Sequence, residues 1–205
     1  MADQFAPPVP ARAGAASEVP RPRVIVVGLG NPVLGDDGVG WRIADEVEAV
    51  LAATRASGGP VPPVEVERLG VGGLRLMEFL DGFDEAILVD AAEFPGRPLG
   101  EVRSCALDDI ESYAAGHLDS AHDTSLVTAL ALGRQLGARL PTRIQTVTVQ
   151  IHSSDEFSEH LTPAVEAAVP AAAAAVVALL LAAIDVERGP AETDKRPTDK
   201  RHAIG

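Results

Sequence analysis

Short apolar runs alternate with amphipathic segments through the middle of the chain. Apolar, β-branched runs predict strands at residues 24–28, 64–69, 86–90 and 143–151, with a short edge strand at 101–105. Helical periodicity predicts helices at 38–53, 74–80 and 126–137, and a last helix that begins at Pro163, capped by Thr162. Alternating strands and helices are typical of a mostly parallel sheet covered on both faces. We therefore expect an α/β fold with a mostly parallel twisted sheet, helices on both faces and three layers.

The two ends of the chain lack this pattern. Residues 1–22 are rich in Ala and Pro, and residues 187–205 are charged and contain Pro. Neither segment has an apolar face to bury, so we expect a disordered N-terminal arm and a flexible charged tail. A length of 205 residues leaves one domain, at residues 23–186.

The last expected helix has the most apolar sequence in the chain. Residues 167–184 form an uncharged run of 18 residues, which is long enough to nominate a membrane span. Ten of them are alanine, whose transfer into a bilayer is weakly favourable, and Pro170 interrupts the run. We expect a soluble helix that packs against the sheet, with little of its surface in water.

Composition narrows the function classes. The 17 basic and 30 acidic residues give a net charge of −13, which disfavours nucleic-acid binding because affinity there depends on neutralising phosphates. Cys105 is the only cysteine, so an internal disulfide and a cysteine-rich metal site are excluded. The first residues have no basic segment followed by a hydrophobic one, and we expect a cytoplasmic protein with no membrane partner.

The loop after the first expected strand carries candidate chemistry. Residues 24–40 read VIVVGLGNPVLGDDGVG, a strand followed by a glycine-rich turn and a helix. The dinucleotide fingerprint would need glycine at Val33, and a Walker A loop would need lysine where Asp36 follows Gly35. One aspartate could serve as a helix cap, but a cap does not need the pair Asp36–Asp37. Ligands of open α/β sheets bind at the carboxyl ends of strands, so the pair is a candidate site.

Three residues would converge at this edge of the sheet. Asp37 follows the first strand, Asp90 ends the third, and His122 lies where a helix begins. Two carboxylates and an imidazole suit a borderline divalent ion such as nickel, zinc or iron. A surface histidine and a helix-capping aspartate remain the simpler alternative.

The same segments resemble the nickel–iron hydrogenase maturation endopeptidases. That family has a G-x-G-N strand end followed by an acidic pair, an Asp-Ala strand end, a His before a leucine-rich helix, and a late L-T/S-P-x-V helix start. This chain has them in order: the loop at residues 28–37, Val89-Asp-Ala-Ala92, Ser120-Ala-His-Asp-Thr-Ser-Leu126, and Leu161-Thr-Pro-Ala-Val165.

The resemblance implies a phosphorylase/hydrolase-like fold and a specific reaction. Such an enzyme removes the C-terminal extension of a hydrogenase large-subunit precursor after nickel insertion. Asp37, Asp90 and His122 would be both the catalytic residues and the ligands of nickel, which the precursor supplies, so no resident cofactor is expected. The partner would be the precursor, and the enzyme a monomer. Many members have an acidic residue where this chain has Gly70, which leaves the choice of substrate open.

Two other functions remain open at this point. Peptidyl-tRNA hydrolases share the G-L-G-N-P start, but residues 33–41 lack their later motif and the chain is acidic. A non-enzymatic nickel-binding maturation factor would keep the same three ligands without hydrolysis. The spacing of His152, Glu156 and His160 is a weak metal candidate, because these residues fall in an expected loop. Cys105, in the edge strand, is expected to be a structural thiol.

Overall fold

The computed structural model describes residues 22–70, 72–107, 126–152 and 157–188, with side chains up to residue 183. The elements in chain order are β1 (Val24–Leu29), the 3₁₀ helix η1 (Gly35–Gly38), α1 (Val39–Ala56), β2 (Val64–Leu69), α2 (Gly73–Leu80), β3 (Glu85–Ala92), β4 (Val102–Ala106), α3 (Leu126–Gln135), β5 (Arg143–Gln150) and α4 (Pro163–Arg188). These bounds agree with the expected elements to within a few residues. The expected arm at 1–22 and tail at 187–205 fall almost entirely outside the described residues.

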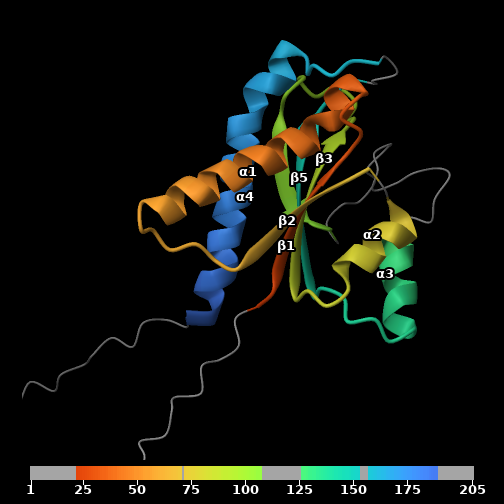
Figure 1. The fold of residues 1–205 in the computed structure, drawn as a ribbon. Coiled ribbons are helices and arrows are strands. Elements are labelled where there is room, and N and C mark those ends of the chain that lie inside the picture. Colours follow the sequence, from red (N-terminus) through yellow and green to blue (C-terminus); the bar gives the residue numbers. More distant parts are fainter. Residues whose placement is uncertain (1–21, 71, 108–125, 153–156, 189–205) are drawn as a thin grey trace, which may run out of the picture.

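One five-stranded sheet organises the molecule. Its strand order is β2-β1-β3-β5-β4, with four parallel strands and β4 antiparallel at one edge. Helices α1 and α4 cover one face, and α2 and α3 cover the other (Figure 1). The expected three-layer α/β fold with a mostly parallel sheet is confirmed.

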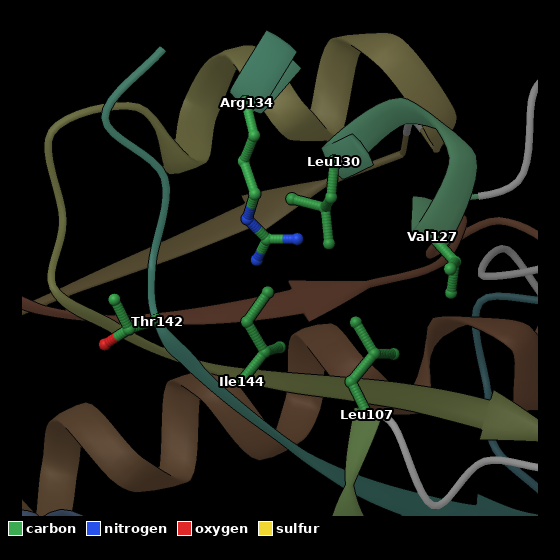
Figure 2. Close-up of a pocket in the computed structure, with 6 residues that line it drawn as sticks. All are labelled: Leu107, Val127, Leu130, Arg134, Thr142 and Ile144. Carbon is green, nitrogen blue, oxygen red and sulfur yellow. The ribbon is translucent and has the colours of Figure 1, made fainter. Parts of the chain in front are cut away.

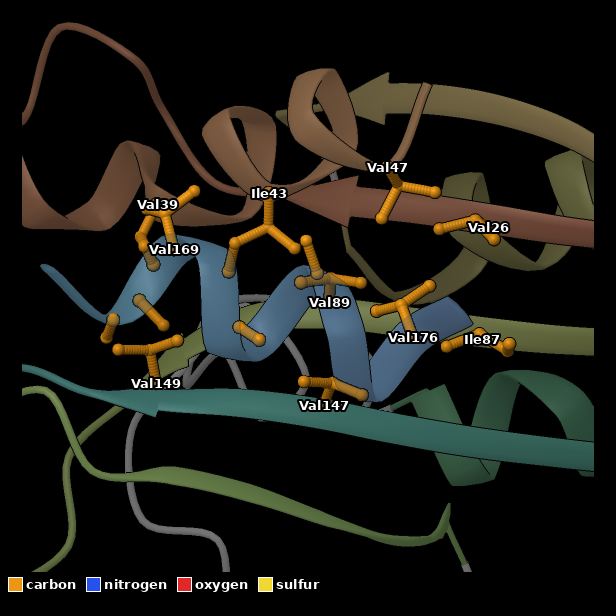
Figure 3. Close-up of a cluster of buried hydrophobic side chains, with 14 of the residues drawn as sticks. Val26, Val39, Ile43, Val47, Ile87, Val89, Val147, Val149, Val169 and Val176 are labelled. Atoms are coloured by element: carbon orange, nitrogen blue, oxygen red, sulfur yellow. The ribbon is translucent and has the colours of Figure 1, made fainter. Parts of the chain in front are cut away.

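Strand alternation divides the core into two clusters. Val26 of β1, Val89 of β3 and Val147 of β5 point toward α1 and α4, where Ile43 and Val176 meet them (Figure 3). On the opposite face, the other cluster contains these residues: Ile25, Val27, Leu29, Leu69, Leu76, Leu80, Phe83, Ala86, Leu88, Leu107, Leu126, Leu130, Leu140 and Ile144. Because successive side chains in a strand point to opposite faces, β1 and β3 are apolar on both sides.

Helix α4 only partly matches its expected packing. Its inner residues, among them Ala172 and Val176, are buried against α1 and the sheet, as expected for a soluble core helix. Its outer face is exposed, including Ala174 and Leu181, so the expectation that little of the helix meets water is wrong. The helix lies in an outer layer, and nothing in the described residues covers it from outside. Within that described part, Pro163–Ala183 is also the one span long and apolar enough to cross a membrane by length and composition alone.

Candidate functional site

The adjacent aspartates of η1 have separate partners. Asp36 is only 6% exposed, and its carboxylate accepts hydrogen bonds from the backbone N of Thr162 at 2.6 Å and from its hydroxyl at 2.8 Å. Thr162 is the residue before α4, and its own carbonyl accepts the N–H of Glu166 at 2.9 Å. Thr162 therefore occupies the N-cap position of α4 as expected, and its hydroxyl donates to Asp36. Asp36 joins the first loop to the last helix.

Asp37 bonds within its own loop. It is half-buried, and its Oδ2 accepts the backbone N–H of Asn31 at 2.7 Å. The side chain of Asn31 accepts the N–H of Val33 at 3.2 Å, which tightens the turn between β1 and η1. The loop thus holds the Asp37 carboxylate next to the end of β1.

One glycine before η1 and one in the first turn of α1 allow the backbone on either side of Asp37 to lie close to the sheet. A Cβ on Gly30, whose φ is +120°, would stand 1.9 Å from the carbonyl oxygen of Asp37. A Cβ on Gly40 would stand 2.2 Å from the Leu29 oxygen and 2.6 Å from the Val89 oxygen. The backbone after Asp37 therefore crosses the carboxyl ends of β1 and β3 at a distance that only glycine permits.

Asp90 lies near the end of β3 at the same edge. It is 1% exposed, and its Oδ1 accepts the N–H of Ala91 at 2.9 Å. By strand alternation it shares a face with Leu88, on the side of α2 and α3. Burying a charged carboxylate is costly, so such a group is normally stabilised by hydrogen bonds or a cation. Its type and depth fit the role of a metal ligand.

The third expected ligand cannot be located. His122 lies outside the described residues, as does Glu156, while His152 and His160 are exposed. In the part of the chain that is described, no three His, Cys, Asp or Glu side chains form a cluster able to hold a metal. The structure therefore brings Asp37 and Asp90 to one edge of the sheet, and their role as nickel ligands with His122 stays a prediction.

Polar residues on β5 were missed by the sequence analysis. Thr146, Thr148 and Gln150 are each 3% exposed or less and share the face of Asp90. The Gln150 side chain accepts the N–H of Phe94 at 2.8 Å and donates to the carbonyl of Ile151 at 2.8 Å, so it holds the segment after β3. The signal was the polar phase of an alternating strand, which usually faces solvent but here faces the sheet's second layer.

The Cys105 thiol and a hollow beside α3 are not part of the candidate site. Cys105 of β4 is half-buried, with its sulfur 3.5 Å from the Thr146 hydroxyl, in keeping with a structural thiol. A hollow beside α3 is lined by Leu107, Val127, Leu130, Arg134, Thr142 and Ile144 (Figure 2). It lies toward the start of β5, whereas Thr148 and Asp90 lie toward the carboxyl ends of their strands, so it is separate from the aspartates.

Comparisons with known proteins agree on one family. The model of the HycI hydrogenase maturation proteases matches residues 50–179. The hydrogenase expression/formation protein HupD of Rhizobium leguminosarum bv. viciae is 30% identical over 112 residues, or 55% of this chain and 52% of that protein. HupD of Rhodobacter capsulatus is 29% identical over 145 residues, or 70% of this chain and 64% of that protein. The chain thus spans between about half and two thirds of the length of these relatives.

The fold is also similar to that of solved structures. The hydrogenase maturating endopeptidase HybD from E. coli superposes with a TM-score of 0.61 and 26% identity, over 78% of this chain and 93% of that one. The family model covers more than half of the chain and includes Asp90 and His122, which were chosen from sequence as candidate ligands. This chain belongs to the hydrogenase maturation protease family.

Proposed function

We propose that this protein is an endopeptidase that removes the C-terminal extension of a nickel–iron hydrogenase large-subunit precursor after nickel has been inserted. The observation that carries the proposal is the buried Asp90 near the carboxyl end of β3. The backbone after Asp37 crosses the strand ends there, in a chain of this family. Two carboxylates at one edge supply oxygen ligands, and His122 would add a nitrogen ligand, a set that suits nickel.

In this proposal the metal arrives with the substrate. Nickel bound in the precursor would orient the scissile segment and polarise its carbonyl or a water molecule. Asp90 would provide a rigid ligand, because it lies in β3 and its carboxylate accepts a hydrogen bond from the Ala91 N–H. Asp37 would provide the second from a loop that is anchored by Asn31 and, through the neighbouring Asp36, by Thr162. Ligands held in place by their surroundings need little reorganisation when the precursor binds.

The test compares nickel-loaded with nickel-free precursor, using purified wild-type enzyme and gel-shift detection of the shortened subunit. We expect wild type to cleave only the loaded form, and we expect Asp37→Ala, Asp90→Ala and His122→Ala each to abolish cleavage without unfolding. Glu78→Ala, an exposed carboxylate on α2, is the control and should cleave like wild type. Efficient cleavage of nickel-free precursor would contradict the metal-directed reaction. Binding of loaded precursor without any cleavage would instead favour the non-enzymatic maturation factor.

A further inference from the structure

Three polar residues form a row across the sheet that ends at the candidate site. Asp90 of β3 is the register partner of Thr148 in β5, and Thr148 is the register partner of Arg103 in β4. Register partners point to the same face, so all three lie on the side of α2 and α3. Two strand spacings separate Arg103 from Asp90, or about 10 Å between their Cα atoms.

The guanidinium of Arg103 is held but not neutralised. It lies over the ring of Phe94, 5.0 Å from the centroid, and the residue is exposed. Several other arginines of the sheet and its loops pair with carboxylates, as Arg97 does with Glu101 at 3.5 Å and Arg143 with Glu85 at 3.8 Å. Among the described residues, Arg103 has no such carboxylate. Although the chain has a net charge of −13, this guanidinium near the candidate site is oriented by Phe94 and free to bind an anion.

Thr148, in the middle of the row, supplies a second observation. It is 1% exposed, and its Oγ1 has no hydrogen-bond partner within the described part of the chain. A buried hydroxyl without a partner is costly, so the position calls for a further polar group. The row between Arg103 and Asp90 is therefore polar along its whole length, while the same face nearer the start of β5 is apolar, at Ile144.

We propose that Arg103 binds a carboxylate of the precursor's C-terminal extension while nickel sits at Asp90 and Asp37. This inference rests on the proposed function and names a residue that selects the substrate. An extended peptide advances about 3.3 Å per residue, so about 10 Å corresponds to roughly three residues from the nickel-binding position. Stacking on Phe94 pre-orients the guanidinium, and a planar guanidinium binds a carboxylate through two parallel N–H donors.

The experiment measures cleavage of nickel-loaded precursor as a function of its concentration. We expect Arg103→Gln to raise KM about fivefold, the upper end for the loss of one exposed charge pair, with kcat within about twofold of wild type. The KM of Arg103→Lys should fall between those of wild type and Arg103→Gln, because lysine keeps the charge and loses the two-donor geometry. Arg97→Gln is the matched control, since it removes a nearby arginine already paired with Glu101, and its KM should equal that of wild type. The KM difference between wild type and Arg103→Gln should shrink at high salt.

Two altered precursors identify the carboxylate. If it is a side chain, changing the acidic residues of the extension to their amides should raise KM for wild type but not for Arg103→Gln. If it is the terminal carboxylate, lengthening the extension with neutral residues should raise KM for wild type but not for Arg103→Gln. An unchanged KM for Arg103→Gln, or a loss confined to kcat, would overturn the inference while wild type still cleaves. Failure of wild type to cleave the loaded precursor would count against the proposed function itself.

Discussion

Asp36 and Thr162 are 126 residues apart in the sequence and are joined by two hydrogen bonds, one from the backbone and one from the hydroxyl of Thr162. The bond pair ties the loop that carries Asp37 to the start of α4. A second contact supports it, because Ser158 bonds through its backbone to Val33 at 3.0 Å and to Gly35 at 2.7 Å. The position of Asp37 therefore depends on a segment near the other end of the domain.

Removing this link should lower stability. Asp36→Ala leaves both donors of Thr162 without their acceptor, and we expect a loss of about 2–3 kcal/mol in the free energy of unfolding. Thr162→Val removes only the hydroxyl donor and should cost about 1 kcal/mol. Urea unfolding followed by circular dichroism measures both. Equal stability of Asp36→Ala and wild type would show that the link contributes nothing.

Substitutions of Asp36 and Asp37 should differ in their effect on activity. Asp37→Ala should abolish processing of nickel-loaded precursor, because it removes a proposed ligand. Asp36→Ala should leave partial activity, because it loosens the loop without removing a ligand. The measurement is the rate of precursor shortening at a temperature where both variants are folded. Equal loss in both, or the reverse order, would reject the assignment of Asp37.

Glycine substitutions should show how close the first turn of α1 lies to the sheet. A Cβ at Gly40 would meet the backbone oxygens of Leu29 and Val89, so Gly40→Ala should destabilise the fold by about 3 kcal/mol or more. Gly70→Ala is the control: its Cβ would stand 3.5 Å from the Gly30 oxygen, an ordinary contact, so the effect should stay within about 0.5 kcal/mol. Thermal unfolding of the two variants measures the contrast. Similar melting temperatures would contradict the close approach at Gly40.

Charge substitutions in α4 should distinguish its two faces. Ala172 is fully buried and Ala174 is exposed, although both lie in the same uncharged stretch. Ala172→Glu places a carboxylate in the core and should prevent soluble folding, whereas Ala174→Glu should leave solubility and melting temperature nearly unchanged. Soluble yield without detergent is the measurement. A membrane-spanning helix predicts instead that both substitutions disturb insertion.

A smaller effect is expected where β2 meets α1. Partial burial alone would lower the pKa of Arg68, but hydrogen bonds to Glu48 and Asp45 outweigh it and raise the pKa above its usual value. Arg68→Met should cost about 1 kcal/mol, and less at high salt, because both carboxylates are exposed. Arg75→Met, on the exposed side of α2, is the control and should have no effect. An Arg68→Met cost that does not change with salt would contradict an electrostatic origin.

The sequence by itself determined the elements, the three-layer α/β architecture and the placement of two candidate site residues at one edge of the sheet. Apolar periodicity located the strands and helices because burial selects side chains at every second or at every third and fourth position. Asp37 and Asp90 were placed at one edge because parallel strands end on the same side of a sheet. His122 lies outside the described residues, so its place beside them stays a prediction.

Only the tertiary structure decided which polar groups meet. Asp36 accepts hydrogen bonds from Thr162, and strand register places Arg103, Thr148 and Asp90 in one row. Both pairings connect distant segments, and local periodicity does not encode them. The outer face of α4 is apolar in sequence yet exposed in the fold, because burial depends on which layer a helix occupies and not on its composition alone. A residue's type reflects what it can do, whereas strand register and helix docking decide which partner it reaches.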